Sequence, residues 1–184
     1  TCNESMNSEL SSLFNFLYKR KEPKAFDHLL VSQFNIVDRF TEMIDREISN
    51  QKAGKKAHII IKLNNLEEKN IINKLYEASQ AGVKIEMIVR GICCLKPGVT
   101  GLSENITIRR LVDKYLEHAR IFYFYNDGKE DLVMGSADWM ARNLLRRIEV
   151  IFPVSDPENK EELIEMLKIQ LADNTKANDL DTML

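Results

Sequence analysis

The feature that most constrains the fold is an alternation of short apolar runs with amphipathic stretches across residues 28–89. The run 59–61 consists of isoleucines and is typical of a strand buried on both faces. The runs 28–31 and 83–89 indicate two further strands, and apolar residues between the runs recur at helical spacing. This order, with short connections, predicts right-handed crossovers and a mostly parallel sheet.

Helical spacing and turn signals predict the remaining elements. Asn35 is expected to cap the second helix, and Asn126-Asp127-Gly128 is a strong hairpin signal between two strands. We expect a single domain over 1–172 and a polar, frayed tail over 173–184. The expected helices cover roughly 7–18, 35–54, a stretch ending at Gly82, and a stretch starting at Pro157. The second half of the chain is expected to contain a loop at 91–101 and a helical turn at 113–117. Its expected strands are 106–108, 120–124, 132–134 and 148–152.

The bulk properties exclude several classes of protein. A chain of 184 residues can bury a full core, and a net charge of −2 provides no field for a general nucleic-acid binder. The three cysteines show no zinc-ligand spacing, and their odd number favours a reducing compartment. No run approaches the roughly 20 apolar residues of a membrane span, and no signal peptide is expected. The chain starts at Thr1 instead of Met, which suggests a fragment.

Polar side chains gather where the predicted strands end. Ligands of open parallel sheets bind at the carboxyl ends of the strands. His118 stands at the start of its strand, so that strand must run opposite to the others if His118 shares their site. Arginine, lysine, amides and hydroxyls suit phosphate oxygens. The candidates are Lys62, Asn64, Arg90, His118, Arg120, Ser136, Asp138, Asn143, Arg147 and Glu149.

The candidates also have structural interpretations. Lys62 fits a solvated strand end, and Arg90 fits a structural ion pair, about as well as either fits a phosphate site. Glu149 lies in strand register with Arg147 and could only balance its charge. His118 differs from the other histidines because chemistry-bearing residues surround it in the sequence. The two histidines interpreted as structural are His28 and His58.

A short motif resembles the phospholipase D superfamily. His118-x-Arg120, a hairpin, and then Gly135-Ser136-x-Asp138 resemble the His-x-Lys and Gly-Ser-x-Asn signature of that superfamily. Arg120 replaces the lysine, Asp138 replaces the asparagine, and Tyr125 stands where an aspartate is usual. This match is loose by itself.

Longer motifs resemble polyphosphate kinase of the large, histidine-phosphorylated type, over nearly the whole chain. The resemblance implies an α/β fold whose mixed, largely parallel sheet is flanked by helices in α/β/α layers. The motifs are Leu63-Asn-Asn-Leu66, Leu75-Tyr-Glu-Ala78, Val89-Arg-Gly-Ile-Cys-Cys-Leu95, Tyr115-Leu-Glu-His118 and Ser136-Ala-Asp-Trp-Met140 with Arg142-Asn143.

The polyphosphate kinase resemblance implies one half of a two-part catalytic core. The phosphorylated histidine and the arginines linked to Mg²⁺ would lie upstream of this chain. His118 and Arg90 are similar to positions that contact the nucleotide phosphates, and Arg147 and Glu149 match a further pair in the active-site region. The implied reaction is reversible transfer of the terminal phosphate of ATP to polyphosphate through a phosphohistidine.

Roles and partners are expected from the resemblance together with the residues at the strand ends. His118 is expected to be catalytic, Arg90 and Arg120 to hold phosphate oxygens, and Lys62 to steer the anionic chain. Asn64, Ser136, Asn143 and Arg147 are expected as further phosphate contacts, with Asp138 and Glu149 in support. The expected partners are ATP or ADP, inorganic polyphosphate, Mg²⁺ with ligands outside this chain, the missing amino-terminal domains, and further copies in a homo-oligomer; nucleic acid is not expected. The resemblance implies a cytoplasmic protein and leaves peripheral membrane association open.

Two other functions remain open from the residues. One is a phospholipase D-like phosphodiesterase or nuclease that acts as a homodimer, with His118 as nucleophile. The missing motif lysine and the net negative charge speak against it. The other is a non-catalytic assembly module, which would gain support if Arg90, His118, Arg120 and Arg147 pointed to different faces.

Overall fold

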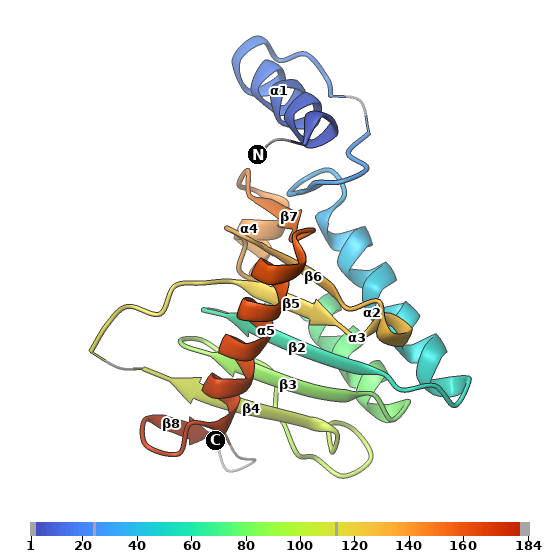
Figure 1. The fold of residues 1–184 in the computed structure, drawn as a ribbon, viewed down its shortest axis with the longest axis vertical. Coiled ribbons are helices and arrows are strands. Elements are labelled where there is room, and N and C mark those ends of the chain that lie inside the picture. The colour runs from blue at the N-terminus through green and yellow to red at the C-terminus, as the bar shows by residue number, and fades with distance from the viewer. Residues whose placement is uncertain (1–2, 24, 113, 181–184) are drawn as a thin grey trace.

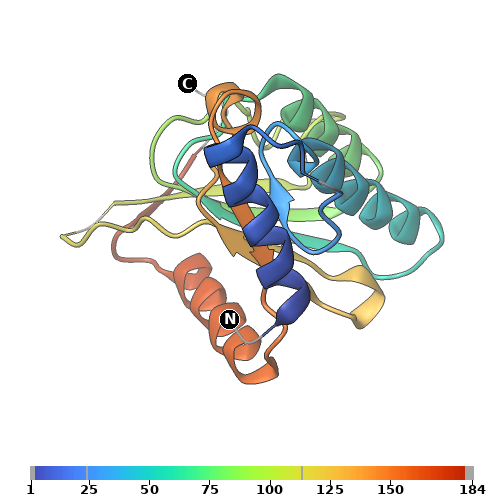
Figure 2. The ribbon, with the colours of Figure 1, turned by 90° about the horizontal axis from the view of Figure 1, so that it is seen from above.

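A mixed sheet of eight strands forms the centre of the chain. The computed structural model describes residues 3–23, 25–112 and 114–180. The strand order of the sheet is β1-β7-β6-β5-β2-β3-β4-β8. Helices α2 and α3 cover one face, α5 crosses the other, and α1 lies beyond the end of the sheet that carries β1 and β7 (Figures 1 and 2). The predicted α/β/α layering is therefore confirmed.

The elements follow the sequence pattern closely in the first half of the chain. The helices are α1 Glu4–Lys19, α2 Ile36–Lys52, α3 Lys69–Gln80, α4 Ala141–Leu145 and α5 Pro157–Ala172, with a 3-10 turn, η1, at Asn126–Gly128. The strands are β1 Leu30–Val31, β2 His58–Leu63, β3 Lys84–Val89, β4 Ile106–Leu111, β5 Ile121–Phe124, β6 Asp131–Gly135, β7 Val150–Pro153 and β8 Ala177–Asp179.

Antiparallel pairing dominates the sheet. Among the described residues, β2–β3 and β3–β4 pair in parallel, whereas the other five pairings are antiparallel. The prediction of a mixed sheet flanked by helices is confirmed, but the prediction that it is largely parallel is wrong. Between β4 and β7, the described residues include no helix longer than the five-residue α4, so β5, β6 and β7 add as antiparallel strands. β5 runs opposite to β2, as the position of His118 requires.

Each face of the sheet has its own core. The larger core joins α2 and α3 to one face and includes Phe40, Phe122 and Trp139. Trp139 is fully buried and stacks on Phe122 with ring centroids 5.1 Å apart. The second core packs Ile164 and Leu167 of α5 on the opposite face. Both faces are thus filled, which leaves the strand ends as the place for polar chemistry.

Four local expectations differ from the structure. Asn35 is the N-cap residue of α2, as predicted, but its side chain makes no capping hydrogen bond and instead accepts from the N–H of Val31 in β1 at 2.7 Å. Residues 114–117 form no helix, and Asp113 lies outside the described residues. Helix α4 forms where no helix was expected. The predicted frayed tail contains β8, which pairs with β4; residues 181–184 lie outside the described part.

In the ranges the structure describes, none of the helices combines the length and the apolar character that crossing a lipid bilayer requires.

Candidate active site

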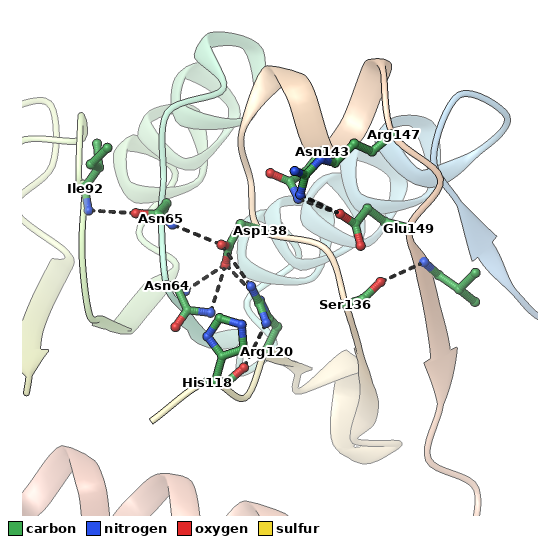
Figure 3. Close-up of polar contacts among 11 residues, drawn as sticks. Asn64, Asn65, Ile92, His118, Arg120, Ser136, Asp138, Asn143, Arg147 and Glu149 are labelled. Carbon is green, nitrogen blue, oxygen red and sulfur yellow. Dashed lines mark hydrogen bonds and ion pairs between the residues drawn. The ribbon is translucent and has the colours of Figure 1, made fainter. Parts of the chain in front are cut away.

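One edge of the sheet gathers the predicted site residues. The carboxyl ends of β2, β3 and β6 meet there with the amino ends of β5 and β7, because β5 and β7 run opposite to β2 and β6. Each of these strand ends carries at least one candidate, with Arg90 after β3, and Figure 3 shows those near β2, β5, β6 and β7. The prediction of a common edge is confirmed.

Asp138 is the hub of this edge. Its carboxylate accepts a fork from Arg120, with Nε at 3.1 Å from Oδ1 and Nη2 at 3.2 Å from Oδ2. The backbone N–H of Asn64 donates to Oδ1 at 2.8 Å, and the Asn64 Nδ2 donates to the same oxygen at 3.3 Å. The side-chain amide of Asn65 donates to Oδ2 at 3.1 Å. One buried carboxylate thereby joins the ends of β2, β5 and β6.

The electrostatics of Asp138 follow from these contacts. Burial would raise the pKa of Asp138, but hydrogen bonds from Arg120 and the Asn64 N–H outweigh burial and lower the pKa overall. Asp138 is therefore ionised at neutral pH and neutralises Arg120. The two departures from the phospholipase D motif, Arg120 and Asp138, are thus partners in one ion pair.

His118 lies exposed beside this ion pair (Figure 3). Its backbone carbonyl accepts a hydrogen bond from Nη1 of Arg120 at 3.0 Å. Desolvation and the positive charges of Arg120 and Arg90 lower the pKa of His118, against an opposing effect of Asp138. The neutral imidazole is therefore the favoured form near pH 7, and it presents one N–H donor.

Arg120 differs from its predicted role as a phosphate ligand. Nε and Nη2 donate to Asp138, and Nη1 donates to the His118 carbonyl. Because all three guanidinium nitrogens of Arg120 donate hydrogen bonds, Arg120 connects Asp138 to the segment that carries His118 and orients that segment.

Lys62 also differs from its predicted role. Its side chain is only 3% exposed and forms an ion pair with Glu117 at 2.9 Å and a hydrogen bond with Gln170 at 2.8 Å. The strand alternation of β2 directs Lys62 to the face covered by α5, so it is not a free cation at the site. Lys62 instead fastens Glu117, the residue before His118. Segments on both sides of His118 are thus tied to the sheet.

Arg90 follows β3 and is half-buried. Its positive charge adds to desolvation and the charge of Arg120 in lowering the pKa of His118. The adjacent Gly91 donates its N–H to the Asn64 carbonyl at 2.7 Å. A Cβ at Gly91 would lie 2.6 Å from Oδ1 of Asn65, so only glycine permits this close approach. The fold thus places the end of β3, with Arg90, and the start of β5, with His118, at the same edge of the sheet.

A second polar cluster lies beside the Asp138 network (Figure 3). Asn143 is buried and donates from Nδ2 to Glu149 at 2.7 Å, while its Oδ1 has no partner among the described residues. Nη1 of Arg147 lies 3.9 Å from Oε1 of Glu149, with its side chain 58% exposed. The Ser136 hydroxyl accepts from the Val150 N–H at 3.2 Å. Arg147 is the cation of this cluster best placed to meet a ligand.

The other two histidines serve as predicted in structural contacts. His28 bonds Glu9 at 2.8 Å, and His58 bonds Glu86 at 2.7 Å. His58 begins β2 and therefore lies at the opposite end of the strand from Asn64. The hydrogen bond from His58 is the largest of the effects that lower the pKa of Glu86 to about 2.

The described residues offer no ready metal centre. No group of three or more His, Cys, Asp or Glu side chains among them is placed to hold a metal ion. The nearest carboxylate to His118 in the hydrogen-bond network, Asp138, is already occupied by Arg120 and two asparagines. Among the described residues, the Asp138 carboxylate is thus committed to protein donors.

Residues outside the predicted set also take part in the site. Asn65 links Asp138 to the Ile92 N–H, at 3.1 and 3.0 Å, and Gln170 of α5 joins Lys62 and Glu117. The adjacent asparagines after β2 were a usable signal for Asn65, since both follow a buried strand. Nothing local in the sequence indicates Gln170, which reaches the site from a helix packed on the far side of the sheet.

Comparison with known proteins gives a consistent family. The family described as "Polyphosphate kinase C-terminal domain 2" matches residues 29–184. The chain is 48% identical to a polyphosphate kinase of Synechocystis sp. over 98% of its length, and 46% identical to one of Vibrio cholerae over 98%. It covers 25% and 26% of those relatives, so it spans about a quarter of their length.

Solved structures agree with this family. A polyphosphate kinase from Porphyromonas gingivalis superposes with a TM-score of 0.96 and 48% identity, over 99% of this chain and 28% of that one. Nuc, a phospholipase D family member from Salmonella typhimurium, matches with a TM-score of 0.58 and 14% identity, over 83% of this chain and 97% of that one, which shows a shared fold. From the family match and the identity across nearly its whole length, this chain belongs to the polyphosphate kinase family, as its carboxyl-terminal domain 2.

Proposed function

We propose that this domain supplies one half of an ATP–polyphosphate phosphotransferase site, whose phosphorylated histidine lies elsewhere in the full-length polypeptide. The observation that carries the proposal is the edge where the Arg120–Asp138 pair holds the His118 segment before β5, on the side of the sheet where β3 ends at Arg90. The relatives named polyphosphate kinase are about four times longer than this chain, which leaves room for the other half.

The proposed reaction consists of two phosphoryl transfers. The histidine outside this chain attacks the terminal phosphorus of ATP, so a nitrogen–phosphorus bond forms, the bond to the ADP oxygen breaks, and ADP leaves. A terminal oxygen of polyphosphate then attacks the phosphohistidine and releases the histidine. A covalent intermediate lets ADP depart before the acceptor arrives. Mg²⁺, held by residues outside this chain, would neutralise phosphate charge when bound.

The residues of this chain contribute positioning and charge. Phosphoryl transfer depends mainly on alignment and on neutralising the charge of the phosphate oxygens. The neutral His118 imidazole would donate its N–H to the transferring group or to the oxygen of the leaving ADP. Arg90 would bind phosphate oxygens with its paired donors. Arg147 would extend this positive edge towards the polyphosphate chain.

Apolar side chains around His118 support a surface covered by the rest of the polypeptide. Tyr115 and Leu116, just before His118, are 77% and 72% exposed, and Ile92, just after Gly91, is 54% exposed. Such side chains beside a polar site are typical of an interface. The second half of the site would cover them.

A phosphodiesterase of the phospholipase D type is the less favoured function. A free cation after the histidine would bind the phosphodiester in that chemistry, but Arg120 is neutralised by Asp138. Both residues of this ion pair, Arg120 and Asp138, depart from the phospholipase D motif.

The isolated chain is expected to make no polyphosphate from ATP, because the phosphorylated histidine is missing. The measurement is radiolabelled polyphosphate formation by the 184-residue chain, with the full-length polypeptide as the positive control. Synthesis by the isolated chain would contradict the two-part site. Phosphodiester cleavage by the isolated chain would favour the phospholipase D alternative.

Arg90→Ala in the full-length enzyme is expected to weaken ATP binding by about 10²-fold, since one charged phosphate donor pair is lost. Calorimetric titration with ATP measures the change. Arg39→Ala is a matched control, because Arg39 is a partly exposed arginine of α2 that pairs with Glu42 at 3.3 Å. Unchanged ATP affinity of Arg90→Ala would rule out the phosphate role of Arg90.

A further inference from the structure

We infer that Asn65 is a positioning residue that fixes Arg90 against the Asp138 hub. The inference rests on the proposed function, in which Arg90 binds phosphate. It assigns a role to a half-buried amide that does not itself contact the expected phosphate position. Two hydrogen bonds of the Asn65 side chain carry the inference. One goes to Asp138 after β6, and the other comes from the Ile92 N–H after β3.

The side chain of Asn65 connects two loops of the site edge. Its Nδ2 donates to Oδ2 of Asp138 at 3.1 Å, and its Oδ1 accepts from the Ile92 N–H at 3.0 Å (Figure 3). A carboxylate can only accept here and a backbone N–H can only donate, so an amide is the side chain that satisfies both. Aspartate would place a second negative charge against Asp138.

The backbone around Asn65 reinforces this connection. The Leu66 N–H donates to the Ile92 carbonyl at 2.8 Å, and the Gly91 N–H donates to the Asn64 carbonyl at 2.7 Å. The turn that carries Arg90 is therefore laid along the segment after β2. Gly91 sits so close that a Cβ would lie 2.6 Å from the Asn65 Oδ1 and 3.1 Å from the Asn64 carbonyl oxygen.

The effect of Asn65 should pass mainly through Arg90. Without Asn65, Asp138 still holds Arg120 through two hydrogen bonds and still accepts the Asn64 N–H. The support of His118 would thus persist. The Ile92 N–H would lose its side-chain acceptor, and the turn after Arg90 would keep only its backbone hydrogen bonds to Asn64 and Leu66.

A double-mutant cycle in the full-length enzyme tests this role. Asn65→Ala is expected to weaken ATP binding about ten-fold, as for the loss of a hydrogen bond to a charged group. Arg90→Ala should weaken it about 10²-fold. If Asn65 acts through Arg90, the double variant should be no weaker than Arg90→Ala alone. Calorimetric ATP titration supplies the readout. It is run below the cooperative unfolding transition of each variant, so that every variant is folded.

Two further variants keep the test decisive. Asn105→Ala is the matched control, because Asn105 is a half-buried asparagine that donates to the Ser79 carbonyl at 2.8 Å far from His118; it should leave ATP affinity unchanged. Gly91→Ala should reproduce the ten-fold loss by displacing the same amide from the other side, and it replaces Asn65→Ala in the cycle if that variant does not fold.

The outcomes separate the inference from the proposed function. Full additivity of Asn65→Ala and Arg90→Ala, or wild-type affinity of Asn65→Ala beside a weakened Arg90→Ala, overturns the role of Asn65 alone. Wild-type affinity of Arg90→Ala overturns the phosphate role of Arg90 and, with it, the role of Asn65. Loss of the Asn65 effect in the Arg90→Ala background supports the inference.

Discussion

Replacing His118 by alanine in the full-length enzyme is expected to lower ATP-to-polyphosphate transfer by roughly 10²–10⁴-fold, as for loss of a positioned acid or hydrogen-bond donor. The reason is geometric. His118 is the exposed imidazole of the edge, its backbone is held by Arg120, and the preceding Glu117 is held by Lys62. Steady-state synthesis of polyphosphate measures the loss.

The control for this substitution is His28→Ala. His28 is an exposed histidine that bonds Glu9 and lies near β1, away from His118. We expect it to retain transfer within a few-fold, as for a surface substitution. Turnover of His118→Ala at the wild-type rate would end the proposal that His118 is catalytic.

The second large effect concerns stability. Asp138→Ala removes the partner of Arg120 and leaves a largely buried guanidinium unpaired, together with the N–H of Asn64. Breaking a buried ion pair in this way typically costs about 3–5 kcal/mol. The side chains of Asp138 and Arg120 are 5% and 13% exposed, so solvent screens the pair little. Urea unfolding of the 184-residue chain measures the cost.

Two comparisons make the Asp138 measurement specific. Glu42→Ala removes an exposed carboxylate paired with Arg39 and should cost less than about 1 kcal/mol. Asp138→Asn keeps the shape and one oxygen acceptor, and should fall between the two. A loss for Asp138→Ala no larger than that for Glu42→Ala would refute the hub role of Asp138.

The Asp138 pair also gives stability a pH dependence with a defined sign. The pKa of Asp138 is lowered in the folded chain, by Arg120 and Asn64 acting against burial. Its stabilisation is therefore fully present above the ordinary aspartate pKa and is lost as the pH falls through the lowered folded value.

Periodicity determined much of the fold in advance. The isoleucines of β2 and the helical spacing before and after them fix the unit from α2 to β3, because burial on both faces leaves few other arrangements. Antiparallel addition of β5, β6 and β7 was not predicted as the dominant pattern, because strand partners are chosen by long-range packing. The β8–β4 pairing was missed because a polar three-residue strand carries no apolar period.

The candidate site was predicted in position more fully than in role. Strand ends identified His118, Arg90, Arg120 and Asp138, since chain direction alone places them at one edge. The roles of Lys62 and Arg120 depend on partners distant in sequence. Lys62 hydrogen-bonds Gln170 of α5 and therefore lies on the face covered by that helix, and Arg120 forms an ion pair with Asp138. Such pairings arise from tertiary packing, which local motifs do not encode.

The most direct test of a two-part site is to locate the phosphohistidine. The full-length enzyme would be labelled with ATP carrying radioactive terminal phosphate, digested under alkaline conditions that preserve phosphohistidine, and mapped by mass spectrometry. The account predicts that the label lies on a histidine outside residues 1–184, that the His118 peptide is unlabelled, and that His118→Ala slows the labelling. Label on His118 itself would contradict the account and make this residue the nucleophile.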